Sequence, residues 1–168
     1  MMISERVKRV QESGTMRMKE LAGQKKAEGK NIISFTVGEP DFDTPKHIVE
    51  AAKKALDDGK TRYLDAPGLP ELREAVANME KNDNNVPCDK SNVLITPTKQ
   101  AIFETILATI NEGEEVIMPD PAWVTYEPCV QLAGGKAVPV VTTDEHEFRI
   151  LPEKVAELIT DKTKMILL

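Results

Sequence analysis

Two residues of one short turn, Thr98 and Lys99, have the side chains of a phosphate-binding site. They end the turn Thr96-Pro97-Thr98-Lys99, which leads into a predicted helix over residues 99–110. The first N–H groups of a helix have no intrahelical partner and attract anions such as phosphate, and a hydroxyl and an ammonium add donors there. Trp123 follows a later apolar run and is placed to cover a flat ring held by that phosphate.

Alternating apolar patterns predict the elements that position these residues. Short apolar runs at 93–95 and 116–118 flank the helix at 99–110 and form a β-α-β unit with it. The pattern continues with a helix at 122–133 that Gly134-Gly135 stops, a strand at 136–141, a polar connection at 144–150, a helix from 151 to 159 and a strand at 165–168. This order predicts an α/β fold with three layers, in which helices cover both faces of a mostly parallel sheet.

The first 90 residues read as an N-terminal helical arm followed by further helices. Residues 5–29 fit a helix interrupted near Gly14, and 31–37 fit a strand that ends in the loop 38–45. Thr44 is expected to cap a helix that has Pro45 at its first position and ends at Gly59. A loop at 61–70 precedes a helix from Pro70 to about residue 81.

Composition excludes several classes of protein. The net charge is −6, with 28 acidic and 22 basic residues, so we expect no nucleic-acid partner. The two cysteines form no metal-binding pattern, and we expect no metal site. Residues 1–10 are charged throughout and no apolar run approaches the ~20 residues that span a bilayer. We therefore expect a cytoplasmic protein with no membrane contact.

Several motifs go beyond a generic α/β domain. They occur in one family's order and spacing: Phe35-Thr36-Val37-Gly38-Glu39-Pro40-Asp41-Phe42-Asp43-Thr44-Pro45, Tyr63 with Gly68 and Glu71-Leu72-Arg73, Lys99-Gln100-Ala101, Glu112-Gly113-Glu114-Glu115-Val116, and Pro121-Ala122-Trp123-Val124-Thr125-Tyr126. The chain resembles the pyridoxal-phosphate-dependent aminotransferases of fold type I, within them the aspartate aminotransferase group. The resemblance covers nearly all of the chain from residue 31 onward and corresponds to less than half of such an enzyme.

The resemblance implies a role for each candidate site residue, and each has a plainer alternative. Thr98 and Lys99 bind the cofactor phosphate, or Thr98 is only a helix cap. Trp123 stacks on the pyridine ring beside the substrate, or it is packing. Tyr63 reaches the phosphate of the other subunit in a homodimer, or it is a surface phenol. Gly38 offers its backbone to the substrate carboxylate, or it is an ordinary loop glycine.

The chain departs from the family pattern in two respects. Pro97-Thr98 stands where the family has a pair of small residues, and the segment is one residue short; proline lacks an N–H, so the Thr98 hydroxyl is expected to replace that donor. The lysine that forms a Schiff base with the cofactor is implied to lie beyond Leu168. No catalytic residue is therefore assigned in this chain.

The resemblance also implies domains and a reaction. Residues 1–45 form the N-terminal arm and a small-domain segment, and residues 46–168 form the first part of the cofactor-binding large domain, expected to be cut off at its carboxyl end. The implied reaction moves an amino group between an amino acid, aspartate or a similar one, and a 2-oxo acid. The alternatives are a non-catalytic remnant or interaction module, and a β-lyase or decarboxylase of the same fold. We expect the 168-residue chain alone to be inactive.

Overall fold

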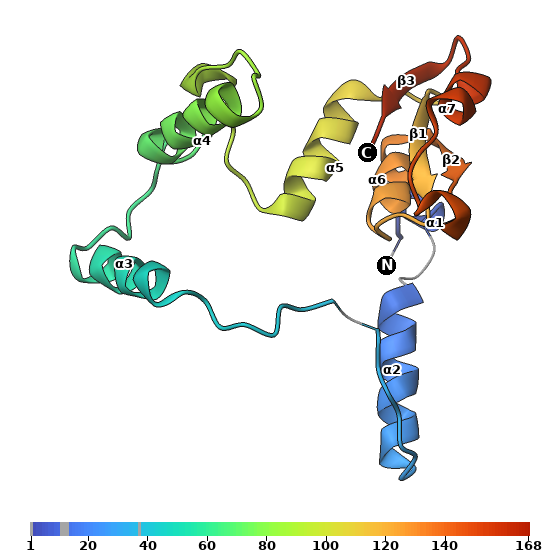
Figure 1. Ribbon diagram of the computed structural model, residues 1–168, viewed down its shortest axis with the longest axis horizontal. Coiled ribbons are helices and arrows are strands. Elements are labelled where there is room, and N and C mark those ends of the chain that lie inside the picture. Colours follow the sequence, from blue (N-terminus) through green and yellow to red (C-terminus); the bar gives the residue numbers. More distant parts are fainter. Residues whose placement is uncertain (1, 11–13, 37) are drawn as a thin grey trace. The chain divides into compact units, whose positions relative to one another are not determined.

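The chain forms two compact units. The computed structural model describes residues 2–10, 14–36 and 38–168. Unit 1 combines Met1–Val37 with Thr98–Leu168, and unit 2 is Gly38–Pro97 (Figure 1). Each unit is described by itself. The predicted domains, 1–45 and 46–168, divide the chain differently and stay a prediction.

Unit 1 is built on a parallel sheet. Its strands are β1 (Glu115–Asp120), β2 (Lys136–Val141) and β3 (Thr163–Ile166), in the order β2-β1-β3. Both pairings of β1 are parallel, because each connection crosses over through a helix. The α/β fold with a parallel sheet is therefore confirmed.

Helices enclose the central strand of this sheet. α5 (Thr98–Thr109) and α6 (Tyr126–Ala133) pack against the face on which Val116 and Met118 lie (Figure 1). Ile117 points to the opposite face, because side chains alternate along a strand, and it is also fully buried. α7 (Pro152–Leu158) contacts β2, and the short helix η2 (Asp144–His146) lies in the predicted polar connection.

Two boundaries in unit 1 differ from prediction. α6 begins at Tyr126 instead of residue 122, because the Tyr126 N–H donates to the carbonyl of Trp123 in a turn that precedes the helix. Its end at Gly134, which has φ 89°, is as predicted. β3 lies two residues earlier than the predicted strand at 165–168, since a turn between Thr160 and Thr163 starts it at Thr163.

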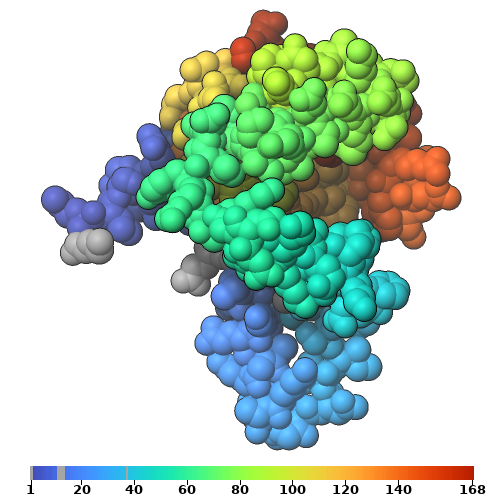
Figure 2. All heavy atoms as spheres, turned by 90° about the vertical axis from the view of Figure 1, so that its left-hand side faces the viewer, coloured from blue at the N-terminus to red at the C-terminus, as the bar shows by residue number. Residues whose placement is uncertain are grey.

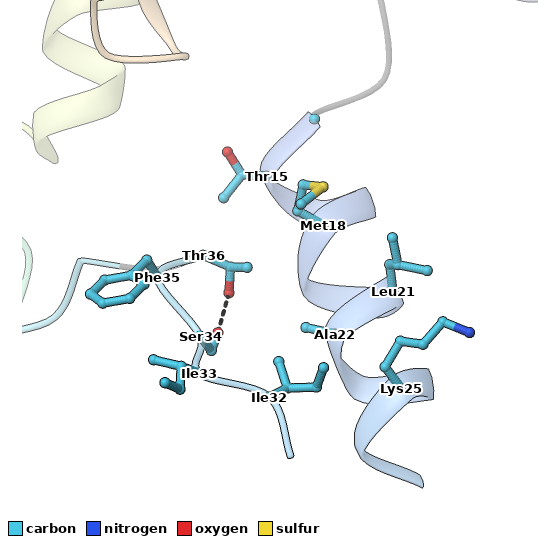
Figure 3. Close-up of a pocket in the computed structure, with 11 residues that line it drawn as sticks. Thr15, Met18, Leu21, Ala22, Lys25, Ile32, Ile33, Ser34, Phe35 and Thr36 are labelled. Carbon is cyan, nitrogen blue, oxygen red and sulfur yellow. Dashed lines mark hydrogen bonds between the residues drawn. The ribbon is translucent and has the colours of Figure 1, made fainter. Parts of the chain in front are cut away.

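The N-terminal part of unit 1 contains α1 (Glu5–Lys8) and α2 (Gly14–Ala27), which confirms a helical arm. The interruption was predicted near Gly14, which is the first residue of α2; residues 11–13 before it lie outside the described residues, as does Val37. The strand predicted at 31–37 is wrong, because residues 31–36 have no strand structure. Instead they run along α2, where Ile32 and Ala22 line one shared groove (Figure 3).

Unit 2 contains α3 (Lys46–Asp57), α4 (Pro70–Asp83) and the single turn η1 (Lys90–Asn92). Pro70 is the first residue of α4, as predicted. α3 starts one residue later than predicted, with Pro45 at the cap position and no side-chain cap, so Thr44 is not its cap. Most side chains of α3 are exposed, and their atoms are drawn in cyan to green in Figure 2.

The strand predicted at 93–95 is also wrong. Val93 has extended dihedral angles, but its carbonyl accepts a hydrogen bond from Arg73 Nε at 2.8 Å. The N–H of Ile95 donates to the carbonyl of Pro67 at 2.9 Å. These backbone groups bind a side chain and a loop, so the segment forms no ladder. Within the described residues, no helix has the length and apolar character needed to cross a membrane.

Candidate cofactor site

The first turn of α5 and the loop after β1 place Lys99 and Trp123 together. Thr98 is the first residue of α5 and Lys99 the second, while Trp123 follows the carboxyl end of β1 by three residues. The Lys99 ammonium lies 5.4 Å from the centroid of the Trp123 ring, within the range of a cation–π interaction. A positive charge, a helix N-terminus and a flat aromatic ring thus meet in one region of unit 1.

Trp123 is held by a second aromatic residue, which the sequence analysis did not assign. The rings of Trp123 and Tyr126 have centroids 5.6 Å apart and an interplanar angle of 84°, an edge-to-face pair. Trp123 remains 39% exposed, so part of its ring is available to a ligand. The signal for Tyr126 was its spacing, because residues three positions apart across one tight turn lie close together.

Cys129 lies beneath this region and is a packing residue. Its side chain is buried in the core formed by α5, α6 and β1. Burial raises the pKa of the Cys129 thiol, and the nearby charge of Lys99 only partly opposes this effect. A thiol with a raised pKa is protonated and unreactive at neutral pH. Cys129 therefore contributes packing and no charge to the region.

Gly38 and Tyr63 belong to unit 2 and are described by their own surroundings. Tyr63 is fully exposed. A Cβ added to Gly38 would have no heavy atom within 4 Å, so no packing contact among the described residues requires a glycine there. Gly68 differs, since it has φ +100° and an added Cβ would lie 2.7 Å from Ile95 Cβ. The ligand roles of Gly38 and Tyr63, like those of Thr98, Lys99 and Trp123, stay predictions.

A mostly apolar groove lies elsewhere in unit 1. It has a volume of about 560 Å³ and lies between α2 and residues 32–36 (Figure 3). Its lining is mostly apolar, with Lys25 as its charged side chain, and the hydroxyls of Ser34 and Thr36 bind each other at 3.1 Å. This lining offers packing surface and no acid–base pair. In the described part of the chain, no three His, Cys, Asp or Glu side chains are grouped to hold a metal ion.

Comparison with known proteins gives a consistent result. The family model for aminotransferase class I and II matches residues 30–168. An aspartate aminotransferase of Pyrococcus abyssi is 47% identical over 141 residues, which are 83% of this chain and 36% of that protein. An aspartate aminotransferase of Bacillus subtilis is 38% identical over 169 residues, covering 100% of this chain and 43% of that protein.

A solved structure shares the fold. The aspartate aminotransferase of Thermus thermophilus with maleate superposes with a TM-score of 0.90 at 38% identity, over 100% of this chain and 44% of that chain. The chain thus spans about two fifths of the length of the curated relatives it matches.

Proposed function

This chain belongs to the aminotransferase class I and II family, and from this membership we propose that it serves the transfer of an amino group between an amino acid and a 2-oxo acid. The relatives at 47% and 38% identity are named aspartate aminotransferases, which favours aspartate as the amino donor. The proposed cofactor is pyridoxal phosphate. The proposed assembly is a homodimer, in which Tyr63 reaches the phosphate of the other subunit.

One observation carries the proposal: Lys99 lies over Trp123 at the start of α5. A phosphate monoester on a flat pyridine ring needs a concentration of donors for its anion and a surface on which its ring can stack. The N-terminus of a 12-residue helix, the Thr98 hydroxyl and the Lys99 ammonium supply the donors, and the partly exposed Trp123 supplies the surface. These groups fit pyridoxal phosphate.

Each of these side chains has a role in binding or orientation. Lys99 neutralises the phosphate, and the Thr98 hydroxyl supplies the donor that Pro97 lacks. Trp123, with its edge against Tyr126, fixes the plane in which the pyridine ring lies. Gly38 leaves room for the substrate carboxylate to approach the backbone. Pyridoxal phosphate, when bound, supplies the electron sink that makes the substrate α-proton removable.

In the first experiment the 168-residue chain is titrated with pyridoxal phosphate, and its melting temperature is measured at each concentration. A ligand that binds only the folded chain raises stability by about 2.7 kcal/mol at 100 times its Kd. Pyridoxal, which lacks the phosphate, is the matched control ligand and should raise the melting temperature less than pyridoxal phosphate does. If neither ligand raises the melting temperature, the proposed site is wrong and a non-catalytic module is favoured.

Variants assign the phosphate contact to its residues. Lys99→Met should weaken pyridoxal phosphate binding about tenfold or more, because it removes a charge-assisted hydrogen bond. Lys154→Met, on α7, removes an equivalent exposed charge and should leave binding unchanged. Thr98→Val should weaken binding while Thr98→Ser keeps it. Equal affinities for Lys99→Met and Lys154→Met would exclude Lys99 as a phosphate ligand.

A further inference from the structure

A buried threonine holds the strand end from which Trp123 emerges. Thr142, which directly follows β2, is 9% exposed. Its N–H donates to the carbonyl of Asp120 at 2.9 Å, and its Oγ1 donates to the same carbonyl at 3.0 Å. Asp120 is the last residue of β1, so both bonds act on the last carbonyl of the central strand.

Of these two hydrogen bonds, only the one from the Thr142 hydroxyl is additional to the backbone ladder of the sheet. Asp120 pairs with Val141 in the parallel ladder, and the bond from the Thr142 N–H is the next ordinary bond of that ladder. Any residue other than proline would supply it. A donor in the side chain is specific to Thr142, and it gives the Asp120 carbonyl a second partner, which restrains the direction in which β1 ends.

The next fixed point along the chain is α6. Pro121 has no N–H to donate, and the first backbone bond after Asp120 is made by the carbonyl of Trp123, which accepts from Tyr126 at 3.0 Å. The loop that carries Trp123 is therefore restrained at one end by Thr142 and at the other by α6. A change in direction at Asp120 would move the Trp123 ring relative to Lys99, which belongs to a different element.

We propose that Thr142 is a positioning residue, whose hydroxyl sets the orientation of Trp123 through the Asp120 carbonyl. The consequence for cofactor binding rests on the proposed function, whereas the effect on Trp123 itself does not. Thr142 makes no contact with the ligand in this scheme. Its contribution is the pre-organisation of an aromatic surface before the ligand arrives.

The test uses Trp123 as its own reporter, because it is the one tryptophan of the 168-residue chain. Thr142→Val keeps the shape and the backbone donor and removes the hydroxyl, Thr142→Ser restores a hydroxyl, and Thr143→Val removes a hydroxyl from the exposed neighbour. In the chain without cofactor, Thr142→Val should raise acrylamide quenching of Trp123 fluorescence and shift its emission. Thr142→Ser and Thr143→Val should both match the wild-type chain.

Pyridoxal phosphate titration is the second readout. Thr142→Val should weaken binding about fivefold, the size expected from one net hydrogen bond, with Thr142→Ser restoring the affinity. Unchanged quenching in a folded Thr142→Val chain would overturn the proposal, and so would an equal change in Thr143→Val. If Thr142→Val does not fold by circular dichroism, Thr142→Ala is compared with Thr142→Ser under the same criteria.

The two proposals fail separately. Quenching that changes only in Thr142→Val, in a chain that does not bind pyridoxal phosphate, supports the positioning of Trp123 and removes the proposed cofactor site. If the wild-type chain binds the cofactor but all variants show identical quenching, the proposed cofactor site is supported and the positioning role of Thr142 is removed.

Discussion

At the scale of single residues, two glycines of unit 2 have different surroundings: one is crowded by the fold, and the other lies in open space. Gly68 is required by the fold, because its φ of +100° and the nearby Ile95 side chain exclude a Cβ. Gly38 is in open space. If Gly38 is needed, the need comes from a ligand, which agrees with its proposed place beside the substrate carboxylate.

Gly68→Ala and Gly38→Ala should therefore differ in stability. Gly68→Ala should lower the free energy of unfolding by at least about 2 kcal/mol, from backbone strain and a Cβ–Cβ clash. Gly38→Ala should leave the melting temperature of the chain unchanged or slightly raised, since alanine restricts the unfolded chain. Thermal denaturation of both variants checks this, and a large loss in Gly38→Ala would show a structural need that its surroundings do not explain.

At the scale of elements, the junction between α6 and β2 is a closely packed turn of unit 1. Gly134 ends α6 in the left-handed region, and Gly135 lies against the core. A Cβ on Gly135 would lie 2.7 Å from Ile110 Cγ2, 3.0 Å from Val130 Cγ1 and 3.2 Å from the carbonyl of Glu114. The turn therefore packs against α6, against the residue that follows α5 and against the residue that precedes β1.

Gly135→Ala should destabilise the chain by about 1–3 kcal/mol, because the core side chains or backbone must shift to admit a methyl group. Gly23→Ala is the matched control: it lies inside α2, where an added Cβ meets nothing within 4 Å. That variant should be neutral or stabilising, by up to about 1 kcal/mol. Urea denaturation measures both, and equal midpoints would contradict the packing argument.

A buried carboxylate joins the amino-terminal ends of the strands. Glu115, at the start of β1, accepts hydrogen bonds from Thr160 Oγ1 at 2.7 Å and Lys136 Nζ at 3.0 Å. The hydrogen bond from Thr160 lowers the pKa of Glu115 below its ordinary value of 4.5, and the bond from Lys136 acts in the same direction. A lowered pKa favours the folded chain while the group is ionised.

The resulting stability is present above pH 4.5 and is lost as the pH falls through the lower pKa of the folded state. Glu115→Gln should reduce stability at pH 7 and flatten its decline in acid. Glu157→Gln, which removes an exposed carboxylate from α7, should keep the wild-type slope. Urea midpoints between pH 7 and pH 3 test this, and parallel profiles for Glu115→Gln and the wild-type chain would count against it.

At the scale of the whole molecule, the sheet of unit 1 has an open side. In the described residues β3 pairs with β1 alone, and an apolar groove of about 250 Å³ lies beside it, between α5 and β3. Its lining is formed by Ala101, Ile102, Thr105, Ile106, Met165 and Leu167. An open strand edge next to apolar surface favours association with other polypeptide.

We expect the purified 168-residue chain to bind cofactor without turning over substrate. It spans about two fifths of its curated relatives, and none of its lysines lies in the motif context that the resemblance implies for the catalytic lysine. A coupled assay with aspartate and 2-oxoglutarate should give the rate of the buffer control. Turnover above that rate would refute the expectation of inactivity, and its loss in Trp123→Leu would show that the turnover depends on the proposed cofactor site.

The sequence by itself determined what depends on local pattern and on ordered motifs. Periodicity predicted α5, the α-helices after β1 and the parallel sheet, and glycine chemistry predicted the end of α6 at Gly134. The motifs identified the family, which the match over residues 30–168 confirmed. The helices and the end of α6 could be predicted because each is set by neighbours a few positions apart in the chain, and the parallel sheet could be predicted because its strands alternate with crossover helices.

Only the tertiary structure decided which apolar runs became strands and which side chains met. Residues 31–36 and 93–95 have strand-like sequences, but a strand exists only where a distant segment supplies backbone partners, and Val93 and Ile95 bind Arg73 and Pro67 instead. The contact of Lys99 with Trp123 and the bond of Thr142 to Asp120 likewise join positions about 20 residues apart. No local pattern contains such contacts, because they depend on how the elements pack.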